Sequence, residues 1–149
     1  MLSQATVHTL KTWKPAFIGL GVLLLLGGWI SFKQAQHQRA EDEIRRIELL
    51  NVQVGLGEGR NGITTGVFGT MIHQGEYTVR LAKLEVKFLG KSGEVLGVKD
   101  FYPVNRFSLE SKQRLRPGES REFGFDLDPH APEAWNGEIE VRLTALELE

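Results

Sequence analysis

Residues 84–89 have the sequence Leu-Glu-Val-Lys-Phe-Leu, in which apolar and charged side chains alternate. Successive side chains of an extended chain point to opposite faces, so this pattern predicts a β-strand with one apolar and one polar face. The same period of two recurs along the rest of the chain. It predicts further strands over residues 50–56, 63–73, 95–102, 123–127 and 139–143.

The predicted strands are separated by residues that favour turns. In the first strand, Leu50, Val52, Val54 and Leu56 are expected to share one apolar face. The turn signals are Asn61-Gly62, Gly75, Ser92-Gly93, Pro117-Gly118 and Asn136-Gly137. About six to seven short strands with regular turns, and no segment of helical period, indicate an all-β fold, a β-sandwich over residues 47–149.

The N-terminal part of the chain has a different character, because residues 15–32 include no charged side chain. As a helix, this run of 18 residues would be roughly 27 Å long, close to the ~30 Å of bilayer hydrocarbon. The run is longer than the apolar core of a secretory signal, and bulky and charged residues follow it where a cleavage site needs small ones. We therefore predict a tail over residues 1–14 and an uncleaved transmembrane helix over residues 15–32.

Within this helix, three residues are candidates for contact with partner helices. Gly21 and Gly28 lie on one helical stripe, which would let another helix approach closely. Trp29 lies near the end of the run, where an indole suits the headgroup layer. The alternative is that the glycines are simply tolerated in a membrane helix.

Residues 33–46 consist of good helix formers without Gly or Pro, and they predict a short helical stalk with a solvated surface. Lys and Arg occur on both sides of the predicted span, with a small excess after it. By the positive-inside rule, that excess slightly favours a cytoplasmic C-terminal domain.

Composition excludes several classes of function. The net charge is −1 and the chain has no long basic run, which argues against a nucleic-acid partner, because such binding depends on clustered Lys and Arg. The chain has no cysteine. Disulfides, thiolate metal sites and thiol nucleophiles are therefore excluded together.

One segment contains residue types that bind divalent cations. Asp126, Asp128 and His130 lie close together, with Glu133 nearby. However, prolines at positions 129 and 132 indicate a connecting loop, and the spacing completes no known coordination loop. We interpret these residues as turn chemistry and predict no metal and no cofactor.

Other catalytic patterns are weaker. No serine lies in a nucleophile-elbow context, and His73, alone on its predicted strand, is expected to be a hydrogen-bonded structural residue. Gly55, Gly57, Gly59 and Gly62 resemble a phosphate-binding loop only in composition, because no helix follows them. We interpret these glycines as a loop or a bulge. We therefore predict a protein that is not an enzyme and has no catalytic residues.

Aromatic side chains are the remaining candidates for a binding surface. They are Phe101, Tyr102, Phe107 and Trp135, with Arg106 beside them. These residue types are enriched at the centres of protein interfaces. Small sandwiches also bury aromatic residues routinely, so core and interface remain alternatives. Exposed strand edges offer a further route to partner binding.

The motifs 67–72 (Val-Phe-Gly-Thr-Met-Ile), 84–89, 93–97 (Gly-Glu-Val-Leu-Gly) and 115–119 (Leu-Arg-Pro-Gly-Glu) together resemble the FxLYD-type domain. They are also similar to related bacterial single-pass proteins that carry an immunoglobulin-like domain of unknown function. The resemblance covers roughly residues 48–148, although Gly90 stands where the name-giving motif has Asp. It implies a non-catalytic, immunoglobulin-like sandwich held outside the bacterial inner membrane by an N-terminal anchor.

These observations lead to one main functional hypothesis. The chain is expected to be an accessory, assembly or stabilising subunit of a larger membrane complex, with the lipid bilayer and other integral membrane subunits as partners. The alternative is a membrane-tethered sandwich that binds a small ligand or lipid. Guided by the family resemblance rather than by the charge count, we expect the sandwich on the periplasmic side.

Overall fold

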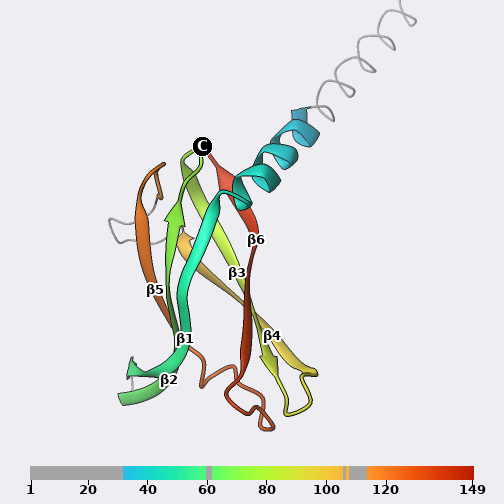
Figure 1. Cartoon of the computed structure of the whole chain (residues 1–149), viewed down its shortest axis with the longest axis vertical. Coiled ribbons are helices and arrows are strands. Elements are labelled where there is room, and N and C mark those ends of the chain that lie inside the picture. The colour runs from blue at the N-terminus through green and yellow to red at the C-terminus, as the bar shows by residue number, and fades with distance from the viewer. Residues whose placement is uncertain (1–31, 60–61, 106, 108–113) are drawn as a thin grey trace, which may run out of the picture. The chain divides into compact units, whose positions relative to one another are not determined.

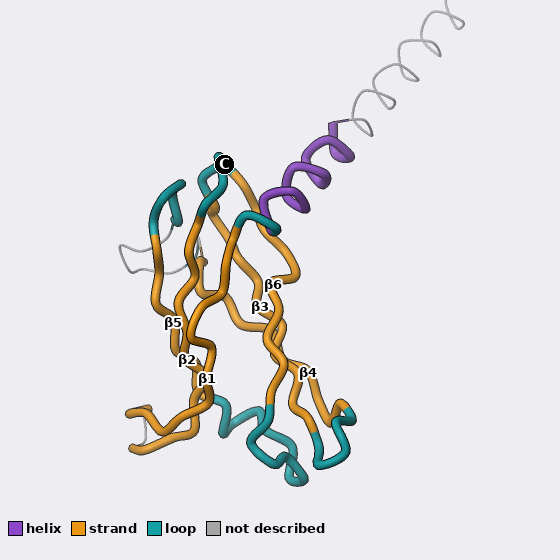
Figure 2. Tube along the Cα trace, in the orientation of Figure 1, coloured by secondary structure: helices purple, strands orange, loops and turns teal. Residues whose placement is uncertain are grey.

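The computed structural model describes residues 32–59, 62–105, 107 and 114–149. They form a helix over residues 32–44 and six β-strands (Figures 1 and 2). The strands are β1 (Ile47–Gly59), β2 (Gly62–His73), β3 (Val79–Leu89), β4 (Val95–Asn105), β5 (Ser120–Asp126) and β6 (Ile139–Leu148). All six belong to one compact unit, Arg39–Glu149, and the description below concerns that unit.

The strands form two antiparallel sheets of three strands each. The strand order is β1-β2-β5 in one sheet and β4-β3-β6 in the other (Figure 1). The prediction of an all-β fold with two packed sheets is thereby confirmed. The core residues come from both sheets and the connections between them: Ile47, Val67, Met71, Val79, Ala82, Leu84, Val86, Phe88, Phe101, Val104, Leu115, Phe123 and Leu127.

Strand β3 has the alternation that its sequence predicts. It pairs with β4 on one side and with β6 on the other. Leu84, Val86 and Phe88 are at most 1 % exposed. Lys87, between two of them, faces away from the core and its Nζ lies 3.2 Å from Glu140 Oε1. Burial of every second side chain in a central strand is what holds its register against a one-residue slip.

Strand β1 departs from the predicted alternation. The pairing with β2 shifts between Leu50 and Gln53, and Asn51 has a φ of 52°. This is a β-bulge, and Asn tolerates the left-handed conformation better than most residues. Leu50 pairs with Thr70 on the outer face, so the prediction that Leu50 shares the face of Val52 and Val54 is wrong.

At the end of the hairpin formed by β1 and β2, the predicted apolar face is exposed to solvent. Leu56 has the inward parity of Val54, yet it is 78 % exposed. Ile63 on the neighbouring strand is 82 % exposed. This end of the hairpin bends away from the other sheet (Figure 1), and its inward-facing side chains are left exposed. Leu56 therefore lies on the predicted face together with Val52 and Val54, but that face is uncovered at this end of the hairpin.

The predicted Pro117-Gly118 turn is present before β5. Gly118 has a φ of 80°, which favours glycine because it has no Cβ. The backbone N–H of Glu119 donates to Arg116 O (3.0 Å), and Gly118 N–H donates to His73 O (2.8 Å). The turn thus closes on itself and is fastened to the end of β2.

Most of the N-terminal predictions fall outside the described part of the chain, namely the tail over 1–14 and all but the last residue of the span predicted over 15–32. Among the described residues, no helix combines the length and the apolar character needed to cross a bilayer. The described helix over 32–44 coincides largely with the predicted stalk over 33–46. However, Glu43 in its last turn is only 1 % exposed, so the solvated surface expected for the stalk does not include that residue.

Candidate functional site

Two features of the sandwich stand out as candidate sites. One is a cluster of buried polar side chains between the helix end and the connection from β2 to β3. The other is a groove between the edge strands β1 and β6. The sections of chain that build each of them are far apart in sequence.

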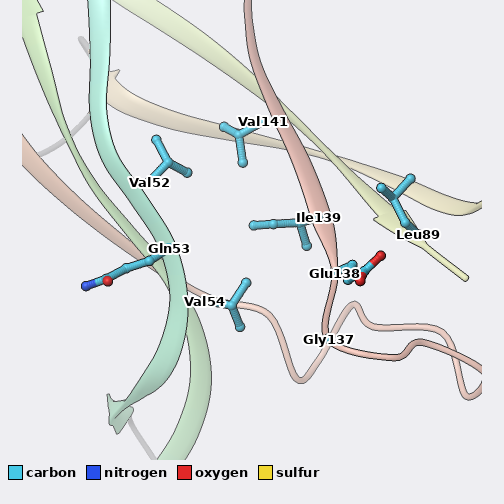
Figure 3. Close-up of a pocket in the computed structure, with 8 residues that line it drawn as sticks. All are labelled: Val52, Gln53, Val54, Leu89, Gly137, Glu138, Ile139 and Val141. Carbon is cyan, nitrogen blue, oxygen red and sulfur yellow. The ribbon is translucent and has the colours of Figure 1, made fainter. Parts of the chain in front are cut away.

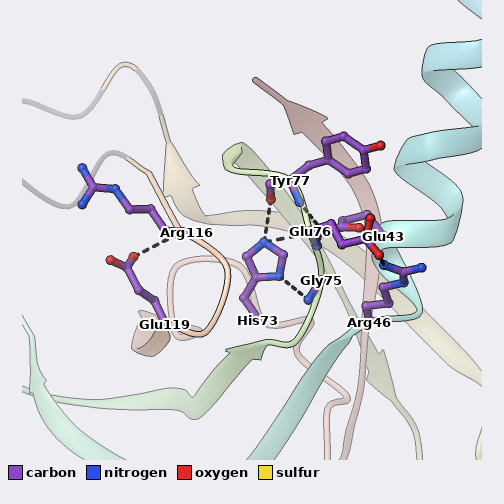
Figure 4. Close-up of polar contacts among 8 residues, drawn as sticks. All are labelled: Glu43, Arg46, His73, Gly75, Glu76, Tyr77, Arg116 and Glu119. Atoms are coloured by element: carbon purple, nitrogen blue, oxygen red, sulfur yellow. Dashed lines mark hydrogen bonds and ion pairs between the residues drawn. The ribbon is translucent and has the colours of Figure 1, made fainter.

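The polar cluster is centred on Glu43 and His73 (Figure 4). They are the two buried polar or charged residues of the described chain, at 1 % and 0 % exposure. Glu43 Oε1 accepts hydrogen bonds from the backbone N–H of Glu76 (2.6 Å) and of Tyr77 (2.9 Å). It also lies 3.6 Å from His73 Nε2.

Both ring nitrogens of His73 are used inside the cluster. The backbone N–H of Gly75 donates to Nδ1 (3.1 Å), so Nδ1 carries no proton in this arrangement. The proton is therefore assigned to Nε2, which donates to Tyr77 O (2.6 Å). With both nitrogens bonded and the ring inaccessible to solvent, His73 fits the structural role expected for it rather than that of a general base.

A second connection reinforces the same junction from outside. Arg46 Nη1 lies 2.5 Å from Glu76 Oε1, and this hydrogen bond raises the pKa of the exposed Arg46 guanidinium. The backbone N–H of Gln74 donates to Arg46 O (2.9 Å). Together with Glu43, these contacts fasten the end of the helix to the connection that carries the chain from one sheet to the other.

The groove lies along the open side of the sandwich, where each sheet ends in an edge strand. It has a volume of about 520 Å3. Figure 3 shows Val52, Val54, Ile139 and Val141 projecting into it from the two strands. Leu89, Gln53, Gly137 and Glu138 complete the lining. Most of the lining side chains are aliphatic, but polar and apolar atoms contribute about equally to the exposed lining. Because the groove also runs between the edges of two terminal strands, it suits binding better than bond-breaking chemistry.

Asp126 and Asp128, whose residue types can bind cations, form hydrogen bonds with neighbouring residues instead. Asp128 Oδ2 accepts from the backbone N–H of Thr65 (3.0 Å) and from Thr64 Oγ1 (2.8 Å), and these bonds hold the pKa of Asp128 below its ordinary value. Thr64 Oγ1 also contacts Asp126. His130 packs edge-on against Phe101, with ring centroids 5.8 Å apart. In the described part of the chain, no three acidic or histidine side chains are grouped as metal ligands.

The glycines predicted to form a loop or bulge lie in the β1–β2 hairpin instead. Gly55, Gly57 and Gly59 are in β1, and Gly62 begins β2. The ring of Phe68 covers two of these positions, Gly55 and Gly57: a Cβ on Gly57 would lie 2.6 Å from Phe68 Cζ. The expectation of a loop or bulge is therefore wrong, since these glycines lie in paired strands and the bulge is between Leu50 and Gln53. Missing side chains make room for the ring of Phe68 on the outer face of the sheet.

The candidate partner-binding residues divide into three groups. Phe101 is 8 % exposed and stacks on Phe125 at 4.7 Å between centroids, so it belongs to the core. Trp135 also packs at the core, edge-on to Phe88 at 5.3 Å, and donates from Nε1 to Glu138 O. Tyr102 and Phe107 are on the surface, at 42 % and 72 % exposure. The other candidates, Gly21, Gly28, Trp29 and Arg106, lie outside the described residues.

Two features escape prediction from sequence. Glu43 lies in a polar, helix-forming stretch whose composition is that of a solvated surface, and its partners are more than 30 residues away. The groove is formed by edge strands that are not neighbours in the chain, and only the general expectation of free strand edges points to it. Comparison of the chain with protein-family models, curated proteins and solved structures finds no match.

Proposed function

We propose that this protein is a non-catalytic, single-pass membrane protein that serves as an accessory, assembly or stabilising subunit of a larger membrane complex. The observation that carries the binding role is the groove between β1 and β6. It combines aliphatic walls with the two terminal strands of the sheets. Surfaces of this kind accept partner segments, because backbone pairing supplies affinity and the walls select side chains.

The membrane part of the proposal rests on the uncharged run over residues 15–32. Its length suits one crossing of the hydrocarbon layer. We place the protein in a bacterial inner membrane with its sandwich in the periplasm, following the resemblance to FxLYD-type and related single-pass proteins. Since no family model matches the chain, this family assignment is part of the proposal.

The immunoglobulin-like variety of the sandwich is also part of the proposal. It is supported by two pairings between strands that are not consecutive, β2 with β5 and β3 with β6. Pairings of this kind accompany the Greek-key connections of immunoglobulin-like sandwiches.

A second candidate function is the binding of a small or lipidic ligand near the bilayer. It is favoured by the volume of the groove, about 520 Å3, which falls within the range of ligand pockets. The centre of the sandwich is filled by Phe88, Met71 and Leu84. A ligand of this class would therefore lie at the edge of the sandwich rather than between the sheets.

The membrane anchor is tested by fractionation of cells that express the full chain. A double variant, Leu24→Arg with Leu25→Arg, should move the protein out of the membrane fraction, because charged side chains at a helix centre oppose insertion. The matched control, Ser3→Arg, adds a charge to the predicted tail and should leave the protein in the membranes. If the double variant remains in the membrane fraction like the control, the prediction of a transmembrane anchor is wrong.

The subunit role is tested by mild detergent extraction, followed by size measurement and identification of stoichiometric co-purifying proteins. We expect a complex larger than the single chain. A protein that runs only as a free monomer and retains nothing would refute the role. A single chain that retains a stoichiometric lipid or metabolite in native mass spectra would instead support the second candidate.

A further inference from the structure

We propose that Asn136 is a modification site, at which the side-chain amide converts spontaneously to aspartate and isoaspartate and thereby alters one wall of the groove between β1 and β6. The reaction needs only water and the neighbouring backbone, so the inference goes beyond the proposed function and does not rest on it. Asn136 and Gly137 lie in the connection that precedes β6, and both are exposed. Gly137 itself lines the groove.

The attacking group is the backbone nitrogen of Gly137. Its N–H makes no hydrogen bond within the described part of the chain, so a base removes its proton without breaking a native contact. Gly137 has a φ of 96°, a conformation that disfavours every residue with a Cβ. The turn therefore requires the residue type that leaves the path to this nitrogen unobstructed.

The side-chain carbonyl of Asn136 is the group that is attacked. The backbone N–H of Glu138 donates a hydrogen bond to Asn136 Oδ1 (3.0 Å), which folds the side chain back over the Asn136–Gly137 peptide. The same donor stabilises the negative charge that develops on Oδ1 as the nitrogen adds to Cγ. Because both reacting groups belong to one segment, the attack has the rate advantage of an intramolecular reaction.

The atoms balance with water as the co-reactant. A base takes the N–H proton of Gly137, the nitrogen bonds to Asn136 Cγ, and the side-chain nitrogen takes up a proton and leaves as ammonia. Water then opens the resulting cyclic imide. Cleavage between Cγ and the nitrogen gives aspartate at position 136, whereas cleavage at the backbone carbonyl gives isoaspartate, in which the main chain runs through Cγ. No group is oxidised or reduced.

Both products alter the groove wall. Glu138 O accepts hydrogen bonds from Leu89 N–H (3.0 Å) and from Trp135 Nε1 (2.7 Å), and these bonds fasten the residue before β6. Either product places a carboxylate beside Glu138, and isoaspartate also lengthens the main chain by a methylene group. Since Gly137, Glu138 and Ile139 line the groove, we expect this wall to loosen as the protein ages.

Asn105 provides a matched internal control. Its Oδ1 also accepts from the backbone N–H two residues further on, that of Phe107 (2.9 Å), but the residue that follows it is Arg106 rather than glycine. Trypsin releases Asn105 in the peptide 100–106 and Asn136 in the peptide 122–142, each with a single asparagine and no glutamine. The mass gain from loss of ammonia and uptake of water therefore reports on each site separately.

The full chain in detergent is incubated at neutral and at mildly alkaline pH, and samples are digested at intervals. In the native protein, we expect conversion at Asn136 to be at least about tenfold faster than at Asn105. The rate should rise with pH, because a base removes the Gly137 proton. A zero-time sample corrects for conversion during digestion. Asn136→Gln should block the reaction, since the longer side chain would have to close a larger ring.

Amide exchange tests the effect on the groove. The amides of residues 137–139 should exchange faster in aged protein than in fresh protein. The Asn136→Gln variant, aged in the same way, should show no such change. Asn61 is also followed by glycine, but it belongs to a different tryptic peptide, 61–80, and does not contribute to the signal of the peptide 122–142.

Three results would overturn the inference: an intact Asn136 in native protein that converts only after unfolding in urea, equal rates at Asn136 and Asn105, or unchanged exchange at residues 137–139 after conversion. None of these results bears on the membrane anchor or the subunit role, which fractionation and co-purification test independently.

Discussion

A Cβ built on Gly75 would lie 1.9 Å from Glu43 Oε1. Glycine at this position therefore makes room for the carboxylate that holds the backbone of Glu76 and Tyr77. The two residues are 32 positions apart in the chain, yet the buried conformation of one depends on the absence of a side chain on the other.

Replacement of Glu43 by Ala should lower the free energy of unfolding by about 3 kcal/mol. The variant leaves the backbone N–H groups of Glu76 and Tyr77, which are part-buried at this contact, without their acceptor. A donor left unsatisfied in this way costs roughly 1–3 kcal/mol. Urea denaturation of the full chain in detergent measures the change. Glu41→Ala, an exposed position on the same helix, is the control and should stay within about 0.5 kcal/mol. Equal stability of the Glu43 variant and the native protein would contradict the role of the carboxylate.

Gly75→Ala should be strongly destabilising in the native background and much less so in the Glu43→Ala background. The added methyl group collides with a carboxylate that the second variant lacks. A double-mutant cycle of unfolding free energies measures the coupling, which we expect to exceed about 1 kcal/mol. Additive effects of the two substitutions would show that the collision is relieved elsewhere.

The stability contributed by Asp128 should depend on pH. Because the bonds from Thr65 and Thr64 lower the pKa of Asp128 in the folded state, its contribution is complete above the ordinary value of 3.8. It is lost as the pH falls through the lowered folded-state pKa. Asp128→Asn should therefore destabilise the protein at neutral pH, and the two proteins should converge in acid. Thermal unfolding across pH measures this, with the exposed Glu133→Gln as control. A difference that persists unchanged in strong acid would exclude the carboxylate as its source.

Gly57 and Gly66 both lie beneath the ring of Phe68. Removal of that ring should rescue an alanine substitution at Gly57 but not at Gly66. A Cβ on Gly57 would meet the Phe68 ring, whereas a Cβ on Gly66 would also lie 3.1 Å from the backbone oxygen of Phe125. Each Gly→Ala variant should be destabilised by about 1–3 kcal/mol. In a Phe68→Ala background, the cost at Gly57 should largely disappear and the cost at Gly66 should remain. Chemical denaturation of the native protein, the three single variants and the two double variants checks this, and equal rescue at both positions would contradict it.

Substitutions of the aromatic candidates Trp135 and Phe107 should differ in their effect on the free energy of unfolding. Trp135→Ala removes the contact with Phe88 and the hydrogen bond to Glu138 O, so we expect a loss of about 2–3 kcal/mol. Phe107→Ser changes a side chain that is 72 % exposed and should stay within about 0.5 kcal/mol. Thermal or urea unfolding distinguishes the two. A harmless Trp135→Ala substitution would return Trp135 to the set of surface candidates.

The strands could be predicted because each has its own local signal. The alternation in 84–89 is complete within one segment, and its central position in the sheet buries every apolar residue of the predicted face. Local alternation also suggested Leu50 on the wrong face, since a bulge depends on the pairing with β2 and not on β1 alone. Leu56 has the inward direction that the period of two predicts, but it lies where the hairpin bends away from the other sheet and is therefore exposed.

The candidate site could be predicted only in part. His73 was expected to be a bonded structural residue, which its lone position on a strand indicates, whereas its neighbour Glu43 was not expected to be buried. The partners of Glu43 are backbone N–H groups, which every residue except proline possesses. The amino-acid sequence therefore does not indicate which of them Glu43 binds. The groove depends on which strands end each sheet, and this is a property of the topology rather than of any single segment.

The bulge at Asn51 joins two apolar sets of opposite parity. Before it, Ile47 and Leu49 point inward, and after it, Val52 and Val54 do so. Deleting Asn51 would give a regular strand that still buries both sets. Inserting a residue beside it would add a second unpaired position or turn one set to the solvent. The chain should consequently accept the loss of a residue at this place far more readily than the gain of one.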